Sequence, residues 1–253
     1  MNGFKTILLY ELKEEYRRVA FWIGCIFVAI FTFCDIFPYF LSKLTLESPD
    51  FTIYQRLCLR VSEDMALFYY LIIVILCSER IYKDNVLQSS DIIMSLPITK
   101  IQYFWGKVTG VFTSFSIIAL FSMALVLTSN HFFNPLKIDI IYFILYYLIS
   151  TEFIIAFAVI VSTTLTIMTK SYKISTLLCL VLFVFSVLLN PKDNTALFII
   201  FNGKYWMFFK QLQNSSDKVL IEGLLNIAVI LLYMLTLLVL THIKIIKDRD
   251  RIL

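Results

Sequence analysis

The sequence predicts an all-α integral membrane protein that forms one transmembrane domain over residues 1–253. Two observations support this prediction. Hydrophobic residues make up 60% of the chain and charged residues only 16%, and a water-soluble domain of this size cannot bury so much apolar surface. The apolar residues also fall in runs near the length of about 20 residues with which a helix crosses a bilayer. We read six such runs as transmembrane helices, at residues 19–41, 61–78, 106–128, 138–168, 175–190 and 218–242.

The first element, residues 1–18, has the pattern of a helix that lies in the membrane interface. Apolar side chains recur every three or four positions, at Phe4, Leu8, Leu12, Tyr16 and Val19. The remaining faces carry the charged side chains of Lys5, Glu11, Lys13, Glu14, Glu15 and Arg17. This division is typical of an interfacial amphipathic helix, and the alternative is a cytoplasmic extension of the first span. The segment lacks the pattern of a cleaved signal peptide, so we expect it to be retained.

Positive charges favour an orientation with both termini in the cytoplasm. The N-terminus, residues 79–107, the loop at residues 169–173 and the C-terminal tail then carry four, four, two and four Lys or Arg residues. The outer loops take the other eight of the 22, which agrees with the enrichment of Lys and Arg in cytoplasmic loops. The formal net charge of +4 follows from this topology, so a nucleic-acid partner is not needed. We expect membrane lipid to surround the spans.

The cytoplasmic coupling loop, residues 79–105, is predicted to hold a short helix and the start of another. Asp84 or Asn85 can cap the first helix, which ends before Pro97 because proline disfavours a helical residue ahead of it. Thr99 can cap the second helix, which begins near Lys100 and continues into the third span. On the other side of the membrane, residues 191–217 are predicted to form one or two short helices in the outer leaflet, where their aromatic side chains suit the interface.

The loop and its flanks resemble the permease subunits of bacterial type-2 ABC exporters. The resemblance rests on Glu79 and Arg80 at the end of the second span, Ser-Leu-Pro-Ile-Thr-Lys at residues 95–100, and Gly106 with Lys107 opening the third span. It extends along the chain, from the interfacial helix through six spans to the outer helices. Many members carry a glycine and a threonine early in this loop, where this chain has residues 83–85, so the start of the loop helix departs from the family pattern.

The resemblance implies a location, partners and a docking site. The chain would be a multi-pass protein of the bacterial cytoplasmic membrane, paired with a second permease copy or a homologue. The loop between the second and third spans would dock in a groove on a separate ABC ATPase subunit. That subunit would bind ATP and Mg, and this chain would bind no cofactor. The docking residues carried over are Asp84, Asn85, Leu87, Gln88, Ser89, Ser90, Asp91, Met94 and Pro97.

Ionisable side chains inside the predicted spans are candidate functional residues. Glu152 lies well inside the fourth span, where an ionised carboxylate costs about 2.5–3.5 kcal/mol. We expect it either to line the translocation path or dimer interface, or to be a carboxyl hydrogen-bonded to a neighbouring helix. Asp35, in the first span and nearer its outer boundary, is a second candidate for the path or interface. The hydroxyls of Ser162, Thr163, Thr164 and Thr166 can be satisfied by helix carbonyls.

Catalytic and metal-binding patterns are missing from the sequence. His131 and His242 fall at opposite predicted membrane faces, and none of the five cysteines has metal-ligand or disulfide spacing. The sequence contains no metalloprotease pair, nucleophile elbow or phosphate loop. We therefore expect a transport subunit rather than an enzyme, with ATP hydrolysed by a partner chain.

The substrate class follows from weaker observations. The chain has 24 phenylalanines and 14 tyrosines and no predicted large outer domain, which favours an amphipathic substrate; antimicrobial and cytolytic peptides have precedent in the family that the chain resembles. Two other classes stay open. A gradient-driven secondary transporter should have matched broken helices and several intramembrane charges, and a non-transporting immunity or scaffold protein would need no mechanical loop.

Overall fold

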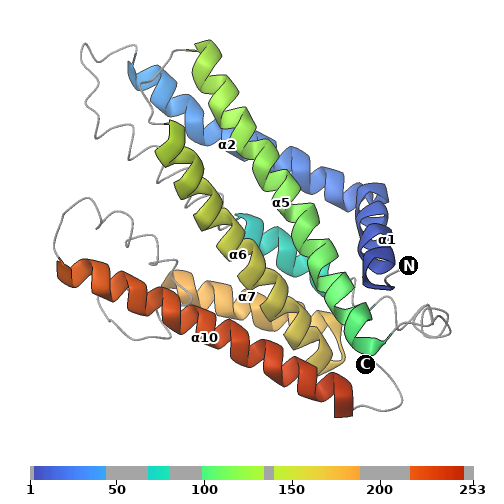
Figure 1. The fold of residues 1–253 in the computed structure, drawn as a ribbon. Coiled ribbons are helices and arrows are strands. Elements are labelled where there is room, and N and C mark those ends of the chain that lie inside the picture. Colours follow the sequence, from blue (N-terminus) through green and yellow to red (C-terminus); the bar gives the residue numbers. More distant parts are fainter. Residues whose placement is uncertain are drawn as a thin grey trace.

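The computed structural model describes residues 3–43, 68–79, 82, 99–133, 140–188 and 217–247. Throughout these residues the secondary structure is helical, with no strands, so the all-α prediction is confirmed for this part of the chain (Figure 1). One helix spans Phe68–Glu79. The other six are α1 Gly3–Arg17, α2 Val19–Lys43, α5 Lys100–Phe133, α6 Ile140–Thr169, α7 Tyr172–Leu188 and α10 Asp217–Lys247.

Two helical segments are long and apolar enough to cross a membrane, Ile101–Thr128 and Thr151–Thr169. A third is added if Phe4–Arg17 and Phe21–Cys34, which meet at a bend of 69°, are counted together. The helices at Phe68–Glu79 and Tyr172–Leu182 are apolar but shorter. These lengths fit a membrane protein, and the full set of six spans stays a prediction.

Several predicted features fall outside the described residues. They are the start of the second span at residues 61–67, the loop helix with its docking residues at positions 84–97, and the outer helices at residues 191–216. Elsewhere the helix bounds lie close to the predicted ones. For example, α1 and α2 begin and end within a few residues of the predicted interfacial helix and first span.

The helices form a bundle in which α6 is the central element. α5 and α6 run side by side in opposite directions, and α7 and α10 pack against the other side of α6 (Figure 1). Two thirds of the segment Thr151–Thr169 of α6 is buried, against 44% of the segment of α5. The start of α5, the turn between α6 and α7, and the C-terminal end of α10 lie toward the same end of the bundle as α1 (Figure 1).

Large aromatic side chains fill the core between α6 and its neighbours. Tyr69, Phe115, Phe143 and Tyr147 are fully buried and come from the helix Phe68–Glu79, α5 and α6. Such side chains bury the most area per residue, and a buried tyrosine needs a partner for its hydroxyl. The core is therefore apolar with hydroxyl groups placed inside it.

A tight turn separates α6 from α7. Lys170 adopts a left-handed backbone conformation with φ of 55°, and its N–H donates to the Thr166 carbonyl over 3.0 Å. The Thr169 hydroxyl donates to the Leu165 carbonyl over 2.8 Å and accepts from the Ser171 N–H over 3.4 Å. A left-handed residue after the last helical turn is a common way to end a helix. The turn lets α7 fold back along α6.

Candidate functional site

The cap predicted from the sequence is present at the first turns of α5, residues 99–110, which we call the base of α5. The Thr99 hydroxyl accepts a hydrogen bond from the Gln102 N–H over 3.2 Å, and the Gln102 side-chain oxygen accepts one from the Thr99 N–H over 3.1 Å. This reciprocal pair is a capping box, which satisfies two backbone donors that the start of a helix leaves without carbonyl partners. The cap places the start of α5 directly after Thr99, which follows the segment predicted to dock.

The first turns of α5 pack closely against α1 through two glycines. A methyl group at Gly106 would lie 2.8 Å from Ile7 Cγ2, and one at Gly110 would lie 2.6 Å from Glu11 Cβ. Both distances are shorter than carbon atoms allow. Glycines four residues apart on one helix let a second helix approach the backbone directly. The pair Gly106 and Gly110 therefore forms the seat on which α1 rests.

Charged side chains are buried where α1 meets α5. Glu11 and Glu15 of α1 are each 1% exposed, and Lys107 of α5 is 3% exposed. Glu11 and Lys107 both lie within electrostatic range of the Cys77 thiol, on the helix Phe68–Glu79. Because burying a lone charge is costly, groups of opposite sign in the same interface offset part of that cost. Buried charges of opposite sign therefore come from α1 and α5.

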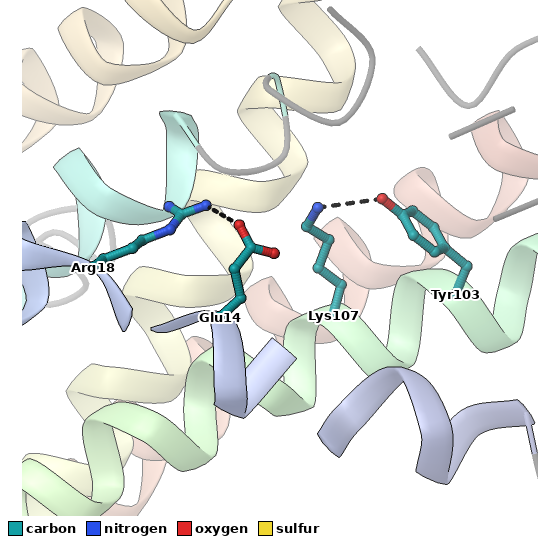
Figure 2. A network of polar contacts seen from close by, with 4 residues as sticks. All are labelled: Glu14, Arg18, Tyr103 and Lys107. Atoms are coloured by element: carbon teal, nitrogen blue, oxygen red, sulfur yellow. Dashed lines mark hydrogen bonds and ion pairs between the residues drawn. The ribbon is translucent and has the colours of Figure 1, made fainter. Parts of the chain in front are cut away.

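Figure 2 shows the polar contacts that flank this interface. On α1, the Glu14 carboxylate and the Arg18 guanidinium form an ion pair of 2.7 Å at the bend before α2. On α5, Lys107 Nζ donates to the Tyr103 hydroxyl over 3.2 Å. Tyr103 is itself buried. Each contact joins residues four positions apart, so it stabilises its own helical turn.

The burial of Glu11 and Glu15 differs from the sequence prediction. Their spacing placed them on polar faces of an interfacial helix, away from the apolar side chains. The structure instead turns Ile7, Glu11 and Glu15 toward α5 and leaves Leu9 and Tyr10 exposed. The missed signal was the Gly-Lys-Val-Thr-Gly sequence at residues 106–110, whose two glycines can receive another helix.

Glu152 lies in α6 and faces a neighbouring helix, as expected. Its carboxylate accepts a hydrogen bond of 2.6 Å from the Ser116 hydroxyl of α5, and the side chain is half-buried. This contact matches the second expectation, a carboxyl that is hydrogen-bonded to a neighbouring helix. The Glu152 side chain is still partly exposed. Asp35 lies in α2, and its side chain is outside the described part of the structure.

Hydroxyl groups connect α6 to its neighbours more often than the sequence indicated. Thr163 and Thr166 donate to carbonyls of their own helix, as predicted. Other contacts cross between helices: Ser78 with Ser162 at 2.8 Å, Thr166 with Ser175 at 2.9 Å, Thr241 with Thr164 at 3.0 Å, and Ser122 with both Tyr69 and Tyr147. These bonds replace contacts to water that the interior cannot offer.

The described residues contain no group of three or more His, Cys, Asp or Glu side chains arranged to hold a metal ion. Cys25, Cys34, Cys77 and Cys179 are free thiols. Hydrogen bonds and buried charged side chains are the main polar features of this part of the chain. Its most organised arrangement is the contact of α1 with the base of α5.

Comparisons with known proteins give no relative: no protein-family model, no curated protein and no solved structure matches the chain.

Proposed function

We propose that the chain is the transmembrane permease subunit of an ATP-driven exporter of the type-2 ABC class. It would move an amphipathic substrate, such as an antimicrobial or cytolytic peptide, out of the cell. ATP and Mg would bind to a separate ATPase subunit, and a second copy of this chain or a homologue would complete the membrane part. The single observation that favours this proposal is the rigid connection at the base of α5.

That connection suits a helix that receives force from the cytoplasm. α5 runs without a break from the Thr99 cap to Phe133, so a push on the preceding segment acts along one continuous helix. Because α1 rests on Gly106 and Gly110, the same push reaches α1 and, through the bend at Arg18, α2. In the proposed cycle, closure of the ATPase dimer presses on the helix at residues 84–95, tilts the first three spans and opens a path between the two permease subunits.

The first test is to identify the partner. The chain is purified from its native membrane in mild detergent, and stoichiometric partners are identified by mass spectrometry. We expect a protein with the phosphate loop Gly-x-x-x-x-Gly-Lys-Ser/Thr to co-purify near one to one. If the chain emerges folded, monodisperse and alone, the proposal fails, and a gradient-driven transporter or an immunity or scaffold protein replaces it.

A second test separates docking from assembly. Ser90→Arg and Asp91→Arg place bulk and positive charge in the proposed docking segment, and we expect each to reduce substrate-stimulated ATPase activity of the reconstituted complex several-fold. Lys173→Glu is the control, because Lys173 is exposed in the first turn of α7 and lies outside the proposed docking segment. Equal activity in all three variants would contradict docking at residues 84–97.

Glu152 favours a second candidate function, gradient-driven transport. A half-buried carboxylate with a Ser116 hydroxyl at 2.6 Å is the kind of group that binds a proton or a cation inside a membrane. This function predicts that Glu152→Gln abolishes uptake or efflux driven by an ion gradient in vesicles without ATP. The exporter proposal predicts that such vesicles transport nothing until ATP and the ATPase subunit are present.

A further inference from the structure

The outward face of α1 has a different charge from the helix as a whole. The described part of α1, with Arg18, contains four basic and three acidic side chains, which nearly balance. In the structure Glu11 and Glu15 are buried against α5, and Glu14 is half-buried and paired with Arg18. Lys5, Lys13 and Arg17 stay exposed. The fold therefore buries two of the three acids and pairs the third with Arg18, so the exposed charged side chains of α1 are Lys5, Lys13 and Arg17.

The same face also exposes apolar and aromatic side chains. Leu9 is 52% exposed, Tyr10 56% and Tyr16 36%. At the helical repeat of 3.6 residues, these three lie on the same side of α1 as Lys5, Lys13 and Arg17. We call these six residues the basic face of α1.

We propose that the basic face of α1 binds the anionic headgroups of the phospholipid leaflet at this end of the bundle. Helices that lie on anionic membranes combine Lys and Arg with exposed aromatic and aliphatic side chains, because the charges attract the headgroups while the apolar groups enter the upper acyl region. Tyrosine rings settle at the same depth. Large apolar side chains that are exposed on one face of a helix indicate that this face contacts a bilayer and not only water.

The burial of Glu11 and Glu15 is what makes the face selective for negative headgroups. On an isolated helix these carboxylates would repel an anionic surface and offset the basic residues. Glu11 lies against Gly110 and both carboxylates are buried, which keeps them away from the headgroups. Each exposed Lys or Arg near such a surface favours binding by about fivefold. The inference does not depend on an ATPase partner.

Trp22 provides a reporter next to the basic face. It is 52% exposed, and its indole N–H donates to the Tyr16 carbonyl over 2.9 Å, so it is fixed to the end of α1. The chain has three tryptophans, and Trp105→Phe with Trp206→Phe leaves Trp22 as the only one. The full-length protein is reconstituted in bilayers containing brominated phosphatidylglycerol or brominated phosphatidylcholine, and quenching of Trp22 fluorescence is compared.

We expect brominated phosphatidylglycerol to quench Trp22 several-fold more effectively than brominated phosphatidylcholine. The preference should fall toward one in the variant Lys5→Gln, Lys13→Gln, Arg17→Gln, and it should weaken at high salt because exposed charges are screened. Lys173→Gln with Lys247→Gln is the control; it removes exposed charge at the same end of the bundle, away from α1, and should keep the preference.

Three outcomes would overturn the inference. The first is equal quenching by the two lipids in the parent protein. The second is an unchanged preference in the triple variant, once its melting temperature shows that it is folded. The third is a triple variant that keeps its lipid preference but no longer co-purifies with a protein partner. That result would show that the basic face binds a protein. All lipid measurements use the chain alone, so they stay separate from the test of the exporter proposal.

Discussion

At the scale of single residues, several polar groups in apolar surroundings meet a partner on a neighbouring helix. Glu152 has its hydrogen bond from Ser116, and Tyr147 has its bond with Ser122. An unsatisfied polar group costs more inside a membrane than in water, because no solvent replaces the missing partner. The partner residues are therefore as informative as the charged residue that first draws attention.

The first prediction concerns the pair of Glu152 and Ser116. Glu152→Gln keeps an acceptor for the Ser116 hydroxyl and removes the ionisable group, so the unfolding temperature should stay equal or rise. Ser116→Ala removes the donor and should destabilise the protein by about 1.5–3 kcal/mol, the range for hydrogen bonds to charged groups. Thermal unfolding in nanodiscs measures both changes.

A matched control exists one turn away on α5. The Thr113 hydroxyl donates over 2.7 Å to the Thr109 carbonyl of its own helix, so Thr113→Val removes no bond between helices and should change the unfolding temperature little. A larger loss from Thr113→Val than from Ser116→Ala would show that the contact with Glu152 contributes nothing to stability.

The second prediction concerns the glycines under α1. Alanine normally stabilises a helix relative to glycine, by roughly 0.5–1 kcal/mol. Gly106→Ala and Gly110→Ala should nevertheless destabilise the protein by about 1–3 kcal/mol, because the new methyl group overlaps Ile7 or Glu11 and α1 must move away. Hydrogen exchange should become faster across α1 before it changes in α6.

Gly24→Ala is the control for this substitution. A methyl group at Gly24 would lie 3.3 Å from Ile72 Cγ2, at the end of a side chain that can adjust. We expect unchanged exchange in α1 and an equal or higher unfolding temperature. If Gly110→Ala behaves in the same way, α1 does not rest closely on α5.

At the scale of helices, local sequence signals decide where each element starts and stops. The Thr99 capping box defines the base of α5, and the left-handed Lys170 ends α6. The second feature also sets a direction, because α7 must return along α6. A change in either would alter how the helices follow one another.

The third prediction tests the cap. Thr99→Ala should destabilise the protein by about 1 kcal/mol, because the Gln102 N–H loses its acceptor. Since Thr99 and Gln102 bond reciprocally, the double variant with Gln102→Ala should lose less than the sum of the single changes. Thr99→Ser keeps the acceptor and should be near neutral. Strict additivity in thermal unfolding would argue against the capping box.

The helices were predictable from sequence to a greater extent than their contacts. Long apolar runs and the Thr99 cap predicted the positions of α2, α5, α6, α7 and α10 well, because hydrophobic length and capping are local properties. The burial of Glu11 and Lys107 was not predictable in this way. It depends on which face of α1 meets Gly106 and Gly110, and that pairing lies about 100 residues apart in the chain.

At the scale of the whole molecule, α6 joins the other helices through apolar packing and hydroxyl bonds together. Ser162 meets Ser78, Thr166 meets Ser175, and Thr164 meets Thr241. Each bond connects α6 to a different helix, so the three bonds limit how α6 can slide or rotate.

The last prediction tests the membrane topology. α1, the start of α5, the α6–α7 turn and the end of α10 lie toward one end of the bundle (Figure 1), and the Lys and Arg distribution predicts that this end is cytoplasmic. Lys5→Cys, Lys173→Cys and Lys247→Cys are introduced singly into a variant without the five native cysteines. A membrane-impermeant maleimide should label all three in inside-out vesicles and none in intact cells.

Lys192→Cys, in the predicted outer region, provides the opposite control and should react in intact cells. The three positions sample separate elements, so their agreement tests the number of crossings between them as well as the orientation. Labelling of Lys173→Cys from outside, with Lys5→Cys reacting only from inside, would require an odd number of crossings between α1 and the α6–α7 turn. Four predicted spans separate these two positions, so that result would exclude the six-span topology. It would also place the α6–α7 turn on the opposite side of the membrane from the expected partner of the docking segment.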